Sequence, residues 1–298
     1  MRLISFRSGS GEMLAVVVDD RWIAAADVLP GGPATMADLL AGGAPMLQAL
    51  RTAADTAGIA ERGEPVDGLE LLAPVPRPGK VVGIGRNYRE HVDEEGADRP
   101  AAPLVFAKWP TSVIGDRAEI RWDPSLTRQV DWEAELGVVI GRLARAVDEA
   151  DALDYVLGYT CLNDVSARDI QFGDGQWVRG KSLDTFCPMG PALITADEIG
   201  DPQDLRIGCL VGSERVQDAR TSQMYFGVAA IVAYCSRSFT LEPGDVIATG
   251  TPGGVGVFRD PPRYLGDGDV VTVEIERIGR LVNVCRTEPA RDRAKVPA

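Results

Sequence analysis

The chain has 298 residues, of which 45% are hydrophobic and 25% are charged, so it can bury a sizeable core and is not expected to be disordered. Its formal net charge is −13, which argues against binding to nucleic acids or to anionic membranes, because both need clustered basic residues. No apolar run approaches the ~20 residues that span a bilayer, and the charged N-terminus lacks the apolar segment of a signal peptide.

The cysteines indicate a reducing compartment. They are widely spaced, odd in number and form no C-x-x-C pair, which argues against a disulfide framework or a zinc site. We therefore expect a cytoplasmic protein with buried structural thiols. The five residues are Cys161, Cys187, Cys209, Cys235 and Cys285.

Residues 1–73 are predicted to form a small N-terminal α/β domain. Two strands, 14–18 and 22–25, form a hairpin turned at Asp19-Asp20, and two helical segments, 35–40 and 44–57, are separated by Gly42-Gly43. Three prolines in residues 74–78 cannot continue a helix or a central strand, so a linker follows. We expect a catalytic domain at 78–288 and a polar tail at 289–298.

Strands outnumber helices in the second domain. The clearest strands are 81–84, 158–162 and 245–249, with a hairpin over 269–285, whereas helices are predicted at 148–157 and 227–239. The strands are joined by short turns. The sequence therefore predicts an α+β, β-rich fold, a mixed β-roll, sandwich or barrel, and not a doubly wound sheet.

Residues 133–140 alternate as expected for a strand with two unlike faces. Its even-numbered positions are apolar, whereas Glu133 and Glu135 fall on the opposite face, about 7 Å apart along the strand. Taken alone, this pattern favours a half-buried strand with a solvated acidic face. A further carboxylate, that of Asp164, follows Asn163 at the end of the predicted strand 158–162.

The only histidine, His91, lies in a predicted helical turn or lid segment at 88–95. Glu94 follows three residues later and falls on the same helical face. A lone histidine is more often structural than catalytic, but an imidazole base in this chain would have to be His91.

Residues 175–182 satisfy the phosphate-loop pattern G-x-x-x-x-G-K-[ST]. That pattern functions between a buried strand and a helix whose N-terminal amides hold phosphates. No buried strand precedes it here, and two prolines follow it closely. We interpret the match as accidental, with a phosphate-loop nucleotide hydrolase kept as a weak alternative.

Five motifs in series resemble the fumarylacetoacetate hydrolase family, over residues 78–286. They are V-G-x-G-x-N-Y-x-x-H from Val82, D-W-E-x-E-L from Asp131, N-D-V-S-x-R-D from Asn163, G-K-S-x-D-T-F from Gly180 and T-G-T-P-x-G-V-G from Thr249. The closing residues 256–262 are similar to one subgroup of that family, the fumarylacetoacetate hydrolase domain-containing proteins of bacteria and mitochondria.

The resemblance implies a mixed β-roll, usually a homodimer, with a divalent metal under a mobile lid. It places the metal on Glu133, Glu135 and Asp164. It assigns catalytic roles to His91, Glu94 and Lys181. Other residues in or beside the matched motifs are expected to contact the substrate; these are Tyr88, Arg168, Gln171 and Thr251. Arg86 is a departure, because many members of the family have a small or apolar residue there, and we expect its added cation to contact the substrate and alter substrate choice.

The chemistry of these side chains agrees with that resemblance. Carboxylate ligands favour Mg²⁺ or Mn²⁺, with Ca²⁺ as a further alternative. Such an ion binds the carboxylate and adjacent carbonyl of a small 2-oxo or β-diketo acid and stabilises an enolate. Lys181 would add a second cation, and His91, polarised by Glu94, would activate water or move a proton.

We therefore predict a metal-dependent hydrolase that cleaves a C–C bond in an acylpyruvate or related β-diketo acid. A close alternative is an isomerase, tautomerase or decarboxylase of an oxo-dioic acid such as oxaloacetate at the same site. A metal-binding module without catalytic activity is the last alternative. Whether water attacks the substrate decides between the first two, and the sequence does not fix that.

Overall fold

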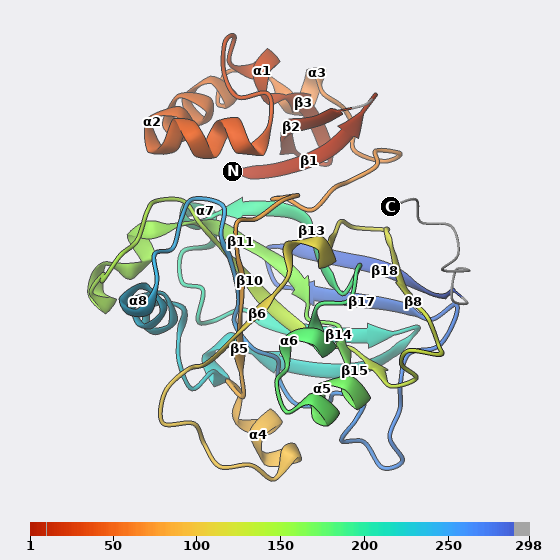
Figure 1. The fold of residues 1–298 in the computed structure, drawn as a ribbon. Coiled ribbons are helices and arrows are strands. Elements are labelled where there is room, and N and C mark those ends of the chain that lie inside the picture. Colours follow the sequence, from red (N-terminus) through yellow and green to blue (C-terminus); the bar gives the residue numbers. More distant parts are fainter. Residues whose placement is uncertain (10, 289–298) are drawn as a thin grey trace, which may run out of the picture.

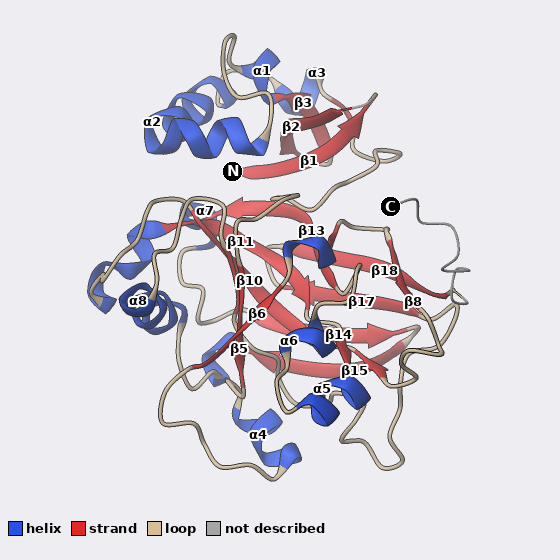
Figure 2. Cartoon of the chain, in the orientation of Figure 1, coloured by secondary structure: helices blue, strands red, loops and turns tan. Residues whose placement is uncertain are grey.

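The computed structural model describes residues 1–9 and 11–288, so the predicted tail at 289–298 lies outside the described residues. Strands dominate this part of the chain and lie at its centre, with most helices around them (Figures 1 and 2). The prediction of a β-rich α+β fold is confirmed.

The largest sheet has 11 strands and runs through the whole molecule. In spatial order it contains β4 (Glu64–Pro65), β3 (Arg21–Ala24), β2 (Gly11–Val18), β1 (Arg2–Ser8), β13 (Cys187–Thr195), β11 (Val156–Asn163), β10 (Ala134–Ile140), β16 (Val246–Ala248), β5 (Val81–Gly85) and β6 (Leu104–Lys108). The short strand β7 (Val113–Ile114) branches off at β13.

Two smaller sheets complete the β-structure. The 5-stranded sheet contains, in spatial order, β15 (Glu214–Arg220), β14 (Arg206–Val211), β17 (Val270–Ile275), β18 (Gly279–Thr287) and β8 (Glu119–Trp122). The 2-stranded sheet pairs β12 (Ser166–Ala167) with β9 (Val130–Asp131). Apolar residues of β10 and β17 belong to one hydrophobic core between the large and the 5-stranded sheet.

The helices of the described residues are short, apart from two. They are α1 (Ala25–Val28), α2 (Met36–Ala54), α3 (Ile59–Arg62), α4 (Arg89–Glu95), α5 (Arg168–Asp174), α6 (Val178–Lys181), α7 (Ala196–Ile199) and α8 (Val228–Ser238), with 3₁₀ turns η1 (Pro110–Ser112), η2 (Glu149–Tyr155) and η3 (Thr221–Gln223). No helix in this part of the chain is long and apolar enough to cross a membrane.

The N-terminal unit forms as its local sequence predicts. Asp19 and Asp20 adopt positive φ angles of 47° and 61°, which suits the tight turn between β2 and β3. Thr35 and Asp38 form a capping box at the start of α2. Gly43, at φ 59°, interrupts α2 and confirms the predicted break between two helical segments.

The N-terminal unit lies at the top of Figure 1 and is joined to the rest of the molecule by more than the linker. Strand β1 pairs with β13 at Arg2–Ile194 and Leu3–Leu193, so the two units share the large sheet. Residues 73–80 contain no helix or strand, as their prolines predict. The division into domains at 1–73 and 78–288 stays a prediction.

Two expectations about local structure are wrong. Every residue of β10 is buried, and Glu133 and Glu135 are only 4% and 1% exposed, so the acidic face is not solvated. The predicted helix at 148–157 is the 3₁₀ turn η2 followed by the start of β11. Only Ala152 is buried in η2, and a segment without an apolar stripe has little to stabilise a longer helix.

All five cysteines are buried and unpaired, as predicted. Burial raises the pKa of the Cys187 thiol to about 12. A thiol with so high a pKa carries almost no thiolate at neutral pH, so Cys187 is not a nucleophile in this environment.

Candidate active site

Three carboxylates converge between the central strands of the large sheet. Glu135 belongs to β10, Glu133 directly precedes that strand, and Asp164 directly follows β11. The antiparallel register pairs Ala134 with Asn163, which brings the three side chains together. Their ligand oxygens all lie within 4.8 Å of one another. We call Glu133, Glu135 and Asp164 the carboxylate cluster.

Backbone groups fix the carboxylate cluster. The Asp164 N–H donates to the Glu133 carbonyl at 2.9 Å, and the Glu133 N–H donates to Asn163 Oδ1 at 3.0 Å. The Gly250 N–H donates to Glu135 Oε2 at 2.7 Å. Because these donors lie directly beside β10 and β11 and in the loop after β16, the paired strands set the positions of the carboxylates.

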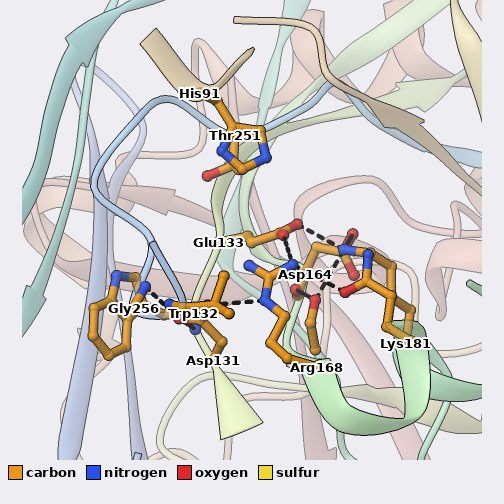
Figure 3. Close-up of polar contacts among 12 residues, drawn as sticks. His91, Asp131, Trp132, Glu133, Asp164, Arg168, Lys181, Thr251 and Gly256 are labelled. Carbon is orange, nitrogen blue, oxygen red and sulfur yellow. Dashed lines mark hydrogen bonds and ion pairs between the residues drawn. The ribbon is translucent and has the colours of Figure 1, made fainter. Parts of the chain in front are cut away.

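Three buried cations surround the cluster, and Figure 3 shows two of them, Arg168 and Lys181. Lys181 Nζ lies 2.7 Å from Glu133 Oε2 and 2.8 Å from Asp164 Oδ2. Lys108 Nζ lies 2.6 Å from Asp164 Oδ1 and also donates to the Lys181 carbonyl. Arg168 Nη1 lies 2.8 Å from Glu133 Oε1. These ion pairs offset the cost of burying three like charges so close together.

The two glutamates have different electrostatic environments. Burial opposes ionisation of Glu133, but the Lys181 and Arg168 cations outweigh burial and lower its pKa to about 2. Burial raises the pKa of Glu135 well above its usual range, and the neighbouring charges of Asp164 and Glu133 raise it further. Ionisation of Glu135 is therefore opposed both by burial and by repulsion from its two neighbours.

The donor set suits a divalent cation. All three candidate ligands are carboxylates, which hard cations such as Mg²⁺, Mn²⁺ and Ca²⁺ prefer. The positive charge of such an ion would relieve the repulsion that Glu135 experiences from its neighbours. The residues present thus fit a divalent metal site formed by Glu133, Glu135 and Asp164.

Helix α4 places the predicted dyad at the site. His91 Nδ1 lies 2.7 Å from Glu94 Oε1, and the Gly254 N–H donates to Glu94 Oε2 at 2.8 Å. Gly254 has φ +100°, and a Cβ there would lie 2.1 Å from the Val216 carbonyl oxygen, so this contact depends on glycine. With Nδ1 engaged by Glu94, Nε2 of His91 is the ring nitrogen left for a ligand.

A small cavity lies between His91 of the dyad and the carboxylates Glu133 and Glu135 of the cluster. Figure 3 shows His91 and Thr251 on one side and Glu133, Arg168 and Lys181 on another. Predicted site residues that line the cavity are Arg86, His91, Glu133, Glu135, Arg168, Gln171, Lys181 and Thr251.

Arg168 is held firmly but keeps one free donor. Its Nε donates to Asp131 Oδ2 at 2.9 Å and its Nη1 donates to Gln171 Oε1 at 3.0 Å. Nη2 is buried and has no hydrogen-bond partner. Leaving a buried guanidinium donor unsatisfied is costly, so this nitrogen is suited to bind an anionic ligand group.

Tyr88 differs from the other predicted substrate-binding residues. It is 1% exposed and does not belong to the cavity lining, and its hydroxyl has no hydrogen-bond partner. Burial, together with the charge of Glu135, raises its pKa well above the usual range. A contact between Tyr88 and the substrate stays a prediction, and the present geometry offers it no access.

Several residues of the site are not among the predicted ones. Lys108 and Asp131 are buried ion-pair partners, and Glu95 and Trp177 line the cavity. Lysine counts offered one signal, because the chain has only four lysines and two of them meet in this site. Trp177 lies within the phosphate-loop pattern at 175–182, and that pattern gives no reason to expect a tryptophan in the cavity wall.

The phosphate-loop interpretation lacks its structural context. Helix α5, and not a buried strand, precedes residues 175–182, and Lys181 itself ends the short helix α6. The Lys181 ammonium binds the carboxylate cluster. A phosphate-binding loop needs backbone amides at the start of a following helix, which residues 183–186 do not form.

Comparison with known proteins agrees with this site. The profile described as fumarylacetoacetate (FAA) hydrolase, C-terminal, matches residues 80–286. The chain belongs to the fumarylacetoacetate hydrolase family. The match includes the carboxylate cluster, the dyad and Lys181, and the resemblance inferred from the five motifs is confirmed.

Individual relatives cover most of the chain. It is 45% identical over 257 residues to the mitochondrial oxaloacetate tautomerase fahd2 of Xenopus laevis, which covers 85% of this chain and 79% of that protein. The structure of a fumarylacetoacetate hydrolase from Exiguobacterium antarcticum has a TM-score of 0.83, with 35% identity and coverage of 97% of this chain and 100% of that one. A maleylpyruvate hydrolase from Sphingobium sp. SYK-6 has a TM-score of 0.80, with 30% identity and coverage of 97% and 100%.

These similarities make the chain an enzyme of the fumarylacetoacetate hydrolase family, with the fold of that family. Between the two activities predicted from the sequence, the curated relative favours the tautomerase alternative over C–C bond hydrolysis.

Proposed function

We propose that this enzyme catalyses the keto–enol tautomerisation of oxaloacetate or of a closely related 2-oxo dicarboxylic acid. The observation that carries the proposal is the His91–Glu94 dyad, whose histidine lines the same cavity as Glu133 and Glu135 of the carboxylate cluster. A tautomerase must move one proton between carbon and oxygen, and a positioned imidazole is suited to both transfers. The Xenopus laevis relative is named an oxaloacetate tautomerase, which supports this choice of reaction.

Binding begins with the substrate carboxylate next to the 2-oxo group. Arg168 offers its unpartnered Nη2 from the cavity wall, while its other nitrogens are held by Asp131, Glu133 and Gln171. A guanidinium fixed in this way orients a carboxylate without losing much side-chain freedom. Thr251 lines the same cavity, and its hydroxyl can donate to the ligand because its oxygen already accepts from Gln217 at 2.8 Å.

The proton moves through His91. In the ketonisation direction, the imidazolium of His91 protonates C3 of the enol, and the neutral imidazole then takes up the proton that leaves the 2-hydroxyl group. In the reverse direction, neutral His91 removes a C3 proton and then gives it to the enolate oxygen at C2. Glu94 stabilises the imidazolium form and fixes the ring, and the Gly254 amide in turn holds Glu94. Lys181 supplies positive charge near the oxygen on which negative charge develops.

A divalent ion held by Glu133, Glu135 and Asp164 would supply a Lewis acid that polarises the 2-oxo group. We propose Mg²⁺ as this ion, with Mn²⁺ or Ca²⁺ as alternatives. A homodimer in the cytoplasm is the accompanying proposal from the sequence. Light scattering of the purified protein would test the dimer, and localisation in the source cell would test the compartment.

Hydrolysis of a C–C bond in an acylpyruvate is the second candidate. The named hydrolases at 30% and 35% identity favour it, because they share this fold over nearly their whole length. In that reaction His91 would activate a water molecule in place of moving a substrate proton. The two candidates therefore differ in products and not in the residues they use.

One experiment separates the candidates. The enzyme with Mg²⁺ is given enol-oxaloacetate, and the loss of the enol absorbance is compared with the uncatalysed rate and with that of His91→Asn. A panel of acylpyruvates is incubated in parallel and its products are identified by NMR. Rapid ketonisation without cleavage supports the tautomerase, whereas release of pyruvate from an acylpyruvate without enol turnover would replace it by the hydrolase.

A further inference from the structure

A salt bridge lies in the partly exposed wall of the cavity, between the two ends of the segment that carries His91. Arg86 directly follows β5, and Glu95 is the last residue of α4. Arg86 Nε lies 2.8 Å from Glu95 Oε2, and Nη2 pairs with Oε1. Both side chains line the cavity, at 34% and 18% exposure. The guanidinium thus presents its planar fork to a carboxylate of the protein itself.

Trp177 holds Arg86 from a second direction. The Arg86 guanidinium lies 5.9 Å from the centre of the Trp177 ring. That ring packs at 5.5 Å from Phe106 and so closely over Gly85 that a Cβ there would lie 2.3 Å from it. Stacking and the planar fork restrict where the guanidinium can lie. The Arg86 guanidinium therefore has a restricted position in the cavity wall, unlike a mobile charge on the surface.

We propose that Arg86 recognises the second carboxylate of the substrate and that Glu95 is an internal substitute for that carboxylate. This inference rests on the proposed function, because it assumes a 2-oxo dicarboxylic acid in this cavity. Arg168 already offers one free donor to an anionic group. Among the cations that line the same cavity, Arg86 is the one whose carboxylate partner is partly exposed, so it is the cation available to a second anionic group.

Exchange of one carboxylate for another explains how such a site would select its ligand. A substrate with a second carboxylate keeps Arg86 paired after Glu95 leaves, so little electrostatic energy is lost. A ligand with a methyl group at that position cannot replace Glu95 and leaves the salt bridge in the cavity wall closed. Selectivity then comes from the cost imposed on the wrong ligand as well as from the contact made with the right one.

Oxaloacetate and 2-oxobutyrate form a matched pair for the test, because they differ only in a carboxylate or a methyl group on C3. Binding to the Mg²⁺-supplied protein is followed by stopped-flow tryptophan fluorescence, which needs no turnover. Arg86→Gln should weaken oxaloacetate binding about tenfold or more and change 2-oxobutyrate binding less than twofold. Glu95→Gln should tighten oxaloacetate binding severalfold, because it removes the competing charge.

Two neighbouring charges provide matched controls. Asp93 is exposed on α4, and the Arg99 guanidinium lies 4.7 Å from the ring centre of Tyr225, away from the cavity lining. Asp93→Asn and Arg99→Gln should leave the preference for oxaloacetate unchanged. Equal weakening of both ligands by Arg86→Gln, or weaker oxaloacetate binding in Glu95→Gln, would overturn the inference.

The same measurements distinguish this inference from the proposed function. Selective binding of oxaloacetate that depends on Arg86, without enol turnover, would leave the inference standing and refute the tautomerase. Enol turnover in the wild type with undiminished oxaloacetate binding in Arg86→Gln would do the reverse.

Discussion

The carboxylate cluster and helix α4 face the same cavity but are held in different ways. Strand β10 is hydrogen-bonded to β11 on one side and to β16 on the other, and it is buried throughout. Helix α4 has seven residues and no side-chain cap at its N-terminus. Two of its side chains hold it in place: Glu94 accepts from the Gly254 amide, and Glu95 pairs with Arg86. The carboxylates proposed to bind a metal ion are thus fixed by a sheet, whereas the histidine proposed to move a proton lies on a short helix.

The largest effect should come from the fixed side of this comparison. Glu135→Gln keeps an acceptor for the Gly250 amide but removes one charge from the cluster. A unit charge at about 4 Å is worth roughly 4 kcal/mol at an effective dielectric near 20, so turnover should fall about a thousandfold. Mn²⁺ affinity, measured by electron paramagnetic resonance, should fall with it.

Chelator-treated wild type is the control for this variant and should lose activity to a similar extent. Circular dichroism should be unchanged, because the substitution preserves side-chain shape. Normal turnover in Glu135→Gln would show that the carboxylate cluster does not hold the catalytic ion.

Removing a buried cation should lower the free energy of unfolding. Lys108→Met leaves the charge of Asp164 with one partner fewer in a fully buried site, and the free energy of unfolding should fall by roughly 3 kcal/mol. Urea denaturation measures this loss. Arg206→Met, which breaks an exposed pair with Asp218, is the matched control and should change the midpoint little. Equal effects of the two variants would refute the contrast between buried and exposed pairs.

On the α4 side, His91→Asn should affect the chemical step. The variant loses the imidazole but retains a polar side chain, so kcat for enol-oxaloacetate should fall about a hundredfold while KM changes little. Steady-state kinetics with and without added imidazole would measure both the loss and its partial rescue. A change confined to KM would mean that His91 binds substrate and does not transfer the proton.

The smallest effect should follow from Glu94→Gln. The glutamine oxygen can accept from Gly254 or from His91 Nδ1, but not from both, and the neutral amide no longer stabilises an imidazolium by charge. A hydrogen bond to a charged group contributes about 1.5 kcal/mol, so its loss should lower kcat about tenfold. A fall in kcat as large as that of His91→Asn would show that Glu94 takes part in the proton transfer directly.

Local patterns predicted most of the fold. The Asp19-Asp20 turn, the break at Gly43 and the strand before Asp164 depend on neighbours in sequence, and all are present. The helix expected at 148–157 failed because an acidic start alone does not supply an apolar face. The pairing of β1 with β13 joins residues far apart in the chain, and no local pattern contains it.

The site was predictable for residues within motifs and not for their distant partners. The E-x-E spacing suggested a solvated face because the sequence near Glu133 shows no cation. The compensating charges come from Lys108, Arg168 and Lys181, on other elements. Likewise, the Glu95 carboxylate is visible in the sequence, but its pairing with Arg86 depends on how α4 folds back against β5.

The central position of β10 has a consequence for hydrogen exchange. Amides of a strand that is paired on both sides and buried on both faces exchange only when much of the molecule unfolds, whereas those of a short helix exchange through local opening. We therefore expect the amide of Glu135 to be among the slowest to exchange, even without a bound ion. Loading the protein with Mg²⁺ should then slow exchange in the loop at Gly250 and hardly change it in β10.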